Sequence, residues 1–217
     1  MSAINVALFG GAFDPICRHH EFMIESIAVH VGMPTWVMPC FHHRFAKNSR
    51  LETPEHRWNM VEAAAESVNE NWLMFENLPS KVCGREILIP FRWQIQNQDD
   101  GSTFETIQCL RKEYPSINFH IVIGMDNANL IETKWDRGNL LIRENPFIVV
   151  KRDGEEETAT WFHDPMHRVL PFEHSGSSTA FRDAIEKKRF FDAKIKVSSK
   201  VWDYVKEHKL YGYKDHG

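Results

Sequence analysis

Hydrophobic and polar positions along the chain form blocks that alternate between two kinds of pattern. Short apolar runs rich in strand-forming residues predict buried strands, and longer stretches with apolar residues at helical spacing predict helices. The predicted strands span residues 4–9, 35–38, 72–75, 119–123, 147–150 and 168–171. The main predicted helices span residues 19–31, 54–70, 102–114, 135–144, 177–188 and 198–207. This alternation predicts an α/β protein with a Rossmann-like, doubly wound parallel sheet and helices on both faces.

The sequence predicts a single domain over residues 1–217, because neither a low-complexity linker nor an internal repeat interrupts it. We expect residues 1–172 to form the sheet and residues 173–217 to form a small C-terminal helical part. Residues 78–100 have no readable pattern, and their role stays open. Ligands of doubly wound sheets bind at the carboxyl ends of the strands, so we expect the site in the loops that follow them.

Composition narrows the classes of function. The chain is 42% hydrophobic and 26% charged with a net charge of −4, which is typical of a globular protein and argues against a nucleic-acid partner. No apolar run approaches the ~20 residues of a membrane helix, and no basic segment precedes the first apolar run, so we expect neither a membrane partner nor a secretory signal. The four cysteines lack zinc-site spacing, which predicts reduced thiols in the cytoplasm and no structural metal. The oligomeric state stays open, with a homo-oligomer among the options.

A glycine pair, Gly10 and Gly11, follows the first predicted strand and precedes a helix that begins with His19 and His20. Glycines let backbone N–H groups approach an anion, and a helix N-terminus adds about half a positive charge. This arrangement favours a phosphate site. Taken alone, the glycines fit an ordinary strand–loop–helix with two surface histidines equally well.

Near the other end of the chain, Ser177, Ser178 and Thr179 stand at the start of a predicted helix, and Arg182 follows one turn later. Hydroxyls and the N–H groups of a helix start suit phosphate oxygens, and a guanidinium adds a two-pronged donor. The alternative is a plain helix cap. Together with the first loop, the phosphate interpretation is favoured.

The first loop resembles a known signature. Gly11, Phe13, Asp14, Pro15 and His20 resemble the G-x-F-[DN]-P-x-[HT]-x-x-H motif of nucleotidylyltransferases, most closely the nicotinamide/nicotinate mononucleotide adenylyltransferases. Many members carry H-x-G-H where this chain has Cys17-Arg18-His19-His20, so the first position departs from the motif. The Ser-Ser-Thr segment resembles the family's I-S-S-T-x-x-R motif, with Gly176 where Ile is usual.

The resemblance implies roles for individual residues. It implies that the phosphates of ATP are held by His20, Arg182 and Lys47, which we take as the catalytic set. It implies that the nucleotide-binding residues are Gly10, Gly11, Phe13, Cys17, Gly124, Asp126, Ser177, Ser178 and Thr179, with Asp126 at the ribose. It implies that the mononucleotide lies near Thr103, with Trp135 and Trp93 as stacking candidates. From the residues alone, helix capping explains Asp126 and Thr103, and core packing explains Trp135.

The reaction that the resemblance implies joins the AMP moiety of ATP to a pyridine mononucleotide, giving NAD or its deamido form and pyrophosphate, with Mg²⁺ bound to the phosphates. Two alternatives stay open. The chain could be another nucleotidylyltransferase, acting in cytidylyl or phosphopantetheine adenylyl transfer. It could also be a catalytically weakened nucleotide-binding regulatory protein, because Cys17 replaces the usual His or Thr. A dehydrogenase is not favoured, because no G-x-G-x-x-G follows a strand.

Overall fold

The computed structural model describes residues 3–43, 51–74, 86–151, 154–170 and 176–214. Within them a single sheet of six parallel strands has the order β3-β2-β1-β4-β5-β6. The strands are β1 (Ile4–Gly11), β2 (Thr35–Pro39), β3 (Leu88–Pro90), β4 (Ile117–Gly124), β5 (Phe147–Val150) and β6 (Arg168–Leu170). The order reverses between β1 and β4, and the loops after these two strands therefore leave a crevice at the edge of the sheet. The predicted Rossmann-like fold is confirmed.

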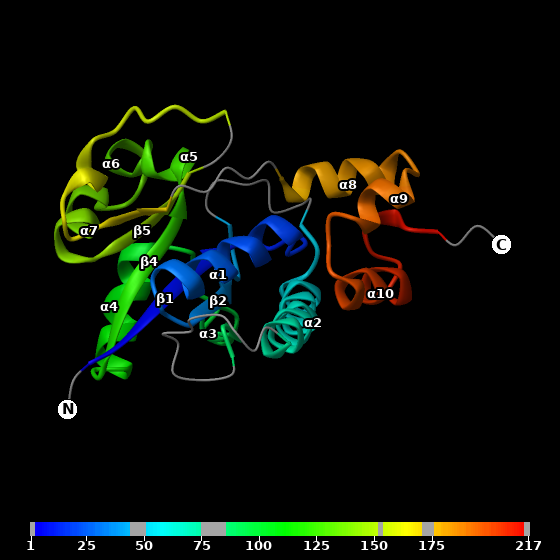
Figure 1. Cartoon of the computed structure of the whole chain (residues 1–217), viewed down its shortest axis with the longest axis horizontal. Helices are drawn as coiled ribbons and strands as arrows, with labels where there is room; N and C mark the ends of the chain where they lie inside the picture. The colour runs from blue at the N-terminus through cyan, green and yellow to red at the C-terminus, as the bar shows by residue number, and fades with distance from the viewer. Residues whose placement is uncertain (1–2, 44–50, 75–85, 152–153, 171–175, 215–217) are drawn as a thin grey trace.

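The helices cover both faces of the sheet and extend beyond one end of it (Figure 1). In chain order the α-helices are α1 (Arg18–His30), α2 (Pro54–Leu73), α3 (Trp93–Gln96), α4 (Thr103–Glu113), α5 (Met125–Ala128), α6 (Ile131–Lys134), α7 (Gly138–Glu144), α8 (Ser178–Glu186), α9 (Phe190–Lys194) and α10 (Ser199–Glu207). Short 3-10 helices lie at η2 (Trp161–His163) and η3 (Leu210–Gly212). Among the described residues, no helix combines the length and the apolar character needed to span a bilayer.

Alternation along β1 divides the core in two. Ala7 and Phe9 point into one cluster with residues of α1, α2, α8 and α10, while Val6 and Leu8 point into another with residues of α3 to α7. Successive side chains of a strand face opposite sides of a sheet, so a strand covered on both faces is apolar throughout. The helices after residue 176 share the first cluster with the sheet, and α10 packs on α2. The division into parts 1–172 and 173–217 stays a prediction.

One predicted strand is wrong. Residues Trp72 and Leu73, expected to begin a strand over 72–75, form the last turn of α2, which therefore runs three residues past the predicted end at Glu70. The third strand is instead β3, inside the stretch 78–100 that the pattern could not assign. Its three residues are too few for a periodic signal, and Pro90 ends it.

Candidate active site

Two adjoining clefts open at the carboxyl ends of β1 and β4. They share the strand-end residues Phe9, Gly10, Gly11 and Gly124, together with His43 and Asn127. The first, which we call the His20 cleft, is further lined by Phe13, Asp14, His19, His20, Asp126, Lys151, Gly176, Ser177, Ser178, Thr179 and Arg182. The second, the Trp135 cleft, is further lined by Met38, Cys40, His42, Gln94, Gly101, Thr103, Thr106 and Trp135. Segments from both ends of the chain thus meet where the strand order reverses, between β1 and β4.

The side chain of His20 is fixed at the start of α1. The backbone N–H of Cys17 donates a hydrogen bond to its Nδ1, with 3.0 Å between the nitrogens. A ring nitrogen that accepts a hydrogen bond carries no proton, so the ring proton of this tautomer is on Nε2. Phe13 packs edge-on against the ring with 5.3 Å between centroids. The structure therefore presents Nε2–H as a hydrogen-bond donor in a cleft where an anion is expected.

Cys17 is buried behind the His20 cleft and is not among the residues that line either cleft. Its side chain is 1% exposed, and the Sγ lies 3.5 Å from the carbonyl oxygen of Pro15 and 4.0 Å from Oγ of Ser178. Burial raises the pKa of the thiol to about 12, so the thiol is protonated at neutral pH. The repulsion that a thiolate would exert on a phosphate is absent. Because the cleft-lining residues do not include it, Cys17 supports the loop from behind, through its backbone N–H and its packing.

Arg182 reaches the first loop from α8. Its Nη1 donates to the backbone carbonyl of Asp14 and lies 3.4 Å from the Asp14 carboxylate, and its Nη2 donates to Oγ1 of Thr179. Asp14 is 1% exposed, and burial raises the pKa of its carboxyl, while the hydroxyl of Tyr211 and the backbone N–H of Glu52 hydrogen-bond to it and oppose that shift. The guanidinium is partly exposed and thus keeps a face toward the His20 cleft.

The hydroxyls at the start of α8 have structural partners. The Ser177 Oγ caps the helix by accepting the Ala180 N–H at 3.0 Å, and the Ser178 Oγ donates to the Pro15 carbonyl at 2.9 Å. The first backbone N–H groups of a helix have no acceptor within the helix. An anion at this position would therefore meet N–H groups of the first turn of α8, while the hydroxyls hold the turn against the first loop.

The glycine at the end of β4 allows the Asp126 carboxylate to fold back on the backbone. A Cβ at Gly124 would lie 2.6 Å from Oδ1 of Asp126. Asp126 lies in α5, immediately after the strand, and lines the His20 cleft. Its carboxylate is therefore presented at the edge of the cleft, and its implied contact with the ribose stays a prediction.

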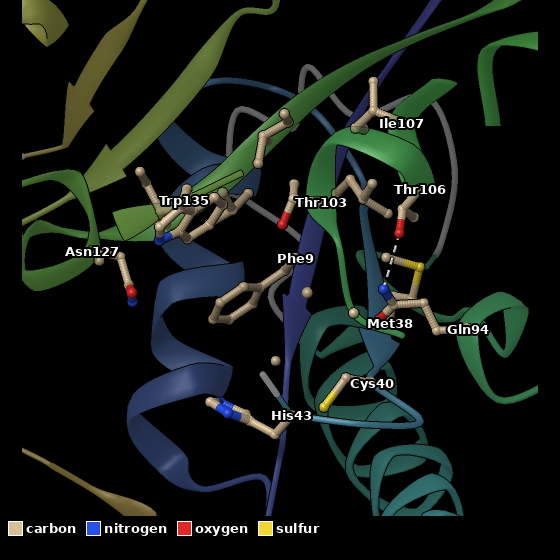
Figure 2. A pocket seen from close by; sticks show the side chains of 18 of the residues that line it. Phe9, Met38, Cys40, His43, Gln94, Thr103, Thr106, Ile107, Asn127 and Trp135 are labelled. Carbon is tan, nitrogen blue, oxygen red and sulfur yellow. Dashed lines mark hydrogen bonds between the residues drawn. The ribbon is translucent and has the colours of Figure 1, made fainter. Parts of the chain in front are cut away.

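The Trp135 cleft combines a flat aromatic wall with polar groups (Figure 2). Trp135 and Asn127 lie on one side, and Thr103 and Thr106 lie on the other. Thr106 is held by two hydrogen bonds, since its Oγ1 donates to Asp99 at 2.7 Å and accepts from Gln94 at 3.1 Å. A flat aromatic wall beside polar side chains suits a planar ring with polar substituents.

His43 lines both clefts and joins them. Burial, and then the nearby Arg57 guanidinium, lower the pKa of its imidazole. With this lowered pKa, His43 is a neutral hydrogen-bonding group near neutral pH. Its neighbour Arg57, itself 1% exposed, donates to the backbone carbonyls of Ala12, Phe41 and Glu52 and so ties the first loop to the segment after β2.

Most of the site residues predicted from the sequence converge on these clefts, with three exceptions. Trp93 lies in the core at 8% exposure, its indole N–H donates to Glu113, and it lines neither cleft, so the clefts give no support to its predicted stacking role. Cys17 is buried behind the loop. Lys47 lies outside the described residues. Tyr211 was not predicted as part of the site, and a pattern read along one sequence gives no signal for a partner so distant in the chain.

A family comparison agrees with this geometry. A model of the family described as cytidylyltransferase-like matches residues 8–184. The chain belongs to the cytidylyltransferase-like family. The match begins inside β1 and ends inside α8, so it includes both segments that form the His20 cleft.

Individual proteins named as nicotinate-nucleotide adenylyltransferases match almost the whole chain. A probable nicotinate-nucleotide adenylyltransferase of Bacillus pumilus is 29% identical over 211 residues, covering 95% of this chain and 98% of that protein. A nicotinate-nucleotide adenylyltransferase of Bacillus subtilis is 27% identical, with the same coverage. A solved structure of the Plasmodium falciparum nicotinic acid mononucleotide adenylyltransferase complexed with NaAD superposes with a TM-score of 0.72 at 20% identity, covering 97% of this chain and 98% of that one. At this identity the last match shows the fold alone.

Proposed function

We propose that this protein transfers the AMP moiety of ATP to nicotinate or nicotinamide mononucleotide, giving the dinucleotide and pyrophosphate. The observation that carries the proposal is the meeting of His20, Arg182 and the start of α8 in one cleft, with the Trp135 cleft beside it. Two adjoining clefts can bind two nucleotides side by side, as a reaction between them requires. The names of the bacterial relatives support the same acceptor class.

In this reaction an oxygen of the mononucleotide's 5′-phosphate attacks the α-phosphorus of ATP, and the bond between that phosphorus and the α–β bridging oxygen breaks. The electron pair leaves with pyrophosphate. A phosphate monoester is already anionic near neutral pH, so the protein's task is to hold two anions in line and to stabilise charge in the transition state. No general base is needed.

The described residues divide into two groups under this proposal. Nε2–H of His20 donates to an α-phosphate oxygen, and Arg182 with the first N–H groups of α8 holds the β- and γ-phosphates. Asp126 accepts hydrogen bonds from ribose hydroxyls. In the Trp135 cleft the indole stacks on the pyridine ring, with Thr103 close to the mononucleotide. A phosphate role for Lys47 stays a prediction.

Magnesium would be held mainly by the substrate. The charged groups that line the His20 cleft include two carboxylates, Asp14 and Asp126, and Asp14 already hydrogen-bonds to Tyr211 and pairs with Arg182. Few protein oxygens remain for an ion, and Mg²⁺ in such sites is bound largely by phosphates and water. When bound, it neutralises charge on the phosphates. The cytoplasmic location and a homo-oligomeric state stay predictions.

The observations favour this function over both alternatives. Transfer of a cytidylyl group, or transfer to phosphopantetheine, is less well supported because the bacterial relatives are named for a nicotinate nucleotide. A catalytically weakened regulator was considered because of Cys17. The buried, protonated thiol lies outside the cleft lining, so this substitution gives no reason to expect a damaged centre.

An acceptor panel tests the proposal. Pyrophosphate release from ATP is measured with nicotinate mononucleotide, nicotinamide mononucleotide, 4′-phosphopantetheine or no acceptor, and with CTP in place of ATP. Release that requires ATP and either pyridine mononucleotide is the expected result. Release with phosphopantetheine or with CTP alone, or no release at all from a folded protein that still binds ATP, would contradict the proposal and support one of the alternatives.

A further inference from the structure

The imidazole of His19 occupies the space directly above Gly176. A Cβ added to Gly176 would lie 2.8 Å from Nδ1, 2.9 Å from Cγ and 3.0 Å from Cβ of His19. Real Cβ atoms essentially never approach other heavy atoms below 3.0 Å, so a side chain at position 176 would displace this histidine. His19 can take its present position only because residue 176 is a glycine.

Besides Cys17, these two residues also depart from the two phosphate motifs. The H-x-G-H pattern has a glycine at the position of His19, and the I-S-S-T pattern has an isoleucine at the position of Gly176. In the motifs the residue at position 19 is small and the residue at position 176 is large, whereas in this chain His19 is large and Gly176 is small. An isoleucine at 176 and a histidine at 19 could not both fit in this arrangement, which joins the two departures physically.

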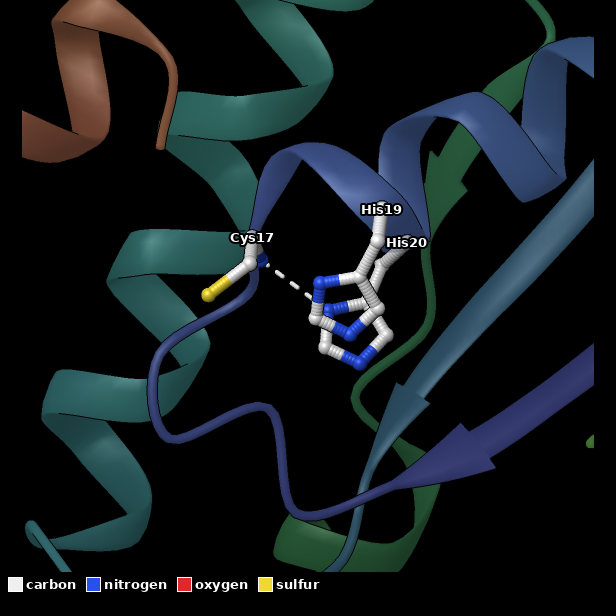
Figure 3. Close-up of side chains that lie close together, drawn as sticks. All are labelled: Cys17, His19 and His20. Atoms are coloured by element: carbon white, nitrogen blue, oxygen red, sulfur yellow. Dashed lines mark hydrogen bonds between the residues drawn. The ribbon is translucent and has the colours of Figure 1, made fainter. Parts of the chain in front are cut away.

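The exchange places a second imidazole in the His20 cleft. The ring centroids of His19 and His20 are 3.8 Å apart with an angle of 41° between the planes, and both residues line the cleft. Figure 3 shows the two rings side by side, pointing the same way. The Sγ of Cys17 lies within 4.8 Å of a ring nitrogen of each. His19 lies against Gly176, which directly precedes the helix start expected to hold the outer phosphates.

We infer that His19 is an additional contact to the triphosphate of ATP, donating a ring N–H to an oxygen of the β- or γ-phosphate. This inference rests on the proposed function and names a residue where the H-x-G-H motif has only a glycine. The imidazole of His20 keeps the α-phosphate.

The direct test compares two ligands that differ in the outer phosphates. The affinities of an ATP analogue with a methylene group between the α- and β-phosphorus atoms, and of AMP, are measured by calorimetry. The variants are His19→Ala and His19→Gln, with His30→Ala as the matched control because His30 is an exposed histidine at the far end of the same helix. Thermal unfolding of each variant verifies the fold.

We expect His19→Ala to weaken binding of the analogue about tenfold and to leave the affinity for AMP within about twofold of the parent's. The reason is that a hydrogen bond to a charged group is lost only with the longer ligand. His19→Gln keeps an N–H donor and recovers part of the affinity. His30→Ala leaves the affinity for both ligands unchanged.

Other outcomes separate this inference from the proposed function. If His19→Ala binds the analogue as tightly as the parent does, or loses as much affinity for AMP as for the analogue, the inference is wrong. Adenylyl transfer by the parent still stands in that case. If the folded parent binds neither ligand and shows no transfer, both proposals are wrong.

A second pair of variants tests the contact itself. Gly176→Ile alone should lower the melting temperature or the affinity for the analogue, because it displaces His19. Adding His19→Gly should restore the fold. A Gly176→Ile variant that matches the parent in both measurements would contradict the contact on which the inference depends.

Discussion

The hydroxyl of Tyr211, close to the end of the chain, donates a hydrogen bond to Oδ1 of Asp14 in the first loop, with 2.9 Å between the oxygens. The two residues are 197 positions apart in the sequence. Burial, and then the Asp14 carboxylate, raise the pKa of the Tyr211 phenol well above its usual value, so the phenol is protonated and donates. Asp14 in turn pairs with Arg182, and the C-terminal segment therefore helps to hold a guanidinium that faces the cleft.

This relationship predicts the effect of Tyr211→Phe. Losing the hydrogen bond should lower the free energy of unfolding by about 1 kcal/mol, and it should also raise the KM for ATP several-fold because Asp14 no longer holds Arg182 in place. Urea unfolding and steady-state kinetics measure the two effects.

Tyr204→Phe is the matched control for that variant. The Tyr204 hydroxyl bonds to Asn59 and His56 between α2 and α10, and Tyr204 lines neither cleft. We expect a similar loss of stability with an unchanged KM for ATP. Equal effects of the two variants on KM would show that Tyr211 acts only through global stability.

A comparison of two tryptophans tests the assignment of the Trp135 cleft. Trp135→Ala removes the aromatic wall and should raise the KM for the mononucleotide about tenfold, by analogy with base–aromatic stacking, while the KM for ATP stays unchanged. Trp135→Phe should recover part of the effect. Trp93→Phe alters a core residue and should reduce stability without changing either KM. The assignment would be reversed if the Trp93 variant raised the KM for the mononucleotide more than the Trp135 variant does.

The state of the Cys17 thiol predicts its reactivity. Because burial raises its pKa to about 12, the thiol remains protonated at pH 8, and its 1% exposure keeps reagents away. Cys109 is an exposed free cysteine. Brief treatment of the folded protein with iodoacetamide at pH 8, followed by peptide mass spectrometry, should label Cys109 and leave Cys17 unlabelled. Labelling of Cys17 at the rate of Cys109 would contradict the buried, neutral thiol.

How far the sequence predicts the fold depends on the length of each element. Long, strongly patterned elements such as β4 and α10 can be located from their periodicity, because eight or nine residues carry a clear signal. The end of α2 was misassigned because Trp72 and Leu73 are apolar residues that suit either a strand or the last turn of a helix. The three-residue strand β3 is defined by its pairing with β2, which a local pattern does not contain.

The candidate site was predictable where candidate residues directly follow a predicted strand or its loop. His20 follows the loop after β1 and Asp126 follows β4, at the carboxyl ends of strands where the predicted fold places ligands. The packing of His19 on Gly176 was not predictable, since the two residues lie in motifs at opposite ends of the chain and only Gly176 was noted as a departure. Their compensation is visible only when the start of α1 is placed beside the start of α8. The burial of the Cys17 thiol likewise follows from tertiary packing.

The central claim is that His20 and Arg182 act on a single triphosphate, with His20 at the α-phosphorus. The most direct measurement uses ATP labelled at the α-phosphorus, nicotinate mononucleotide as acceptor, and the parent beside His20→Ala and His30→Ala. The account predicts that the parent and His30→Ala transfer the label to the dinucleotide, whereas His20→Ala folds normally and loses about 10²–10³-fold in kcat. Transfer by His20→Ala at the rate of the parent would contradict the account.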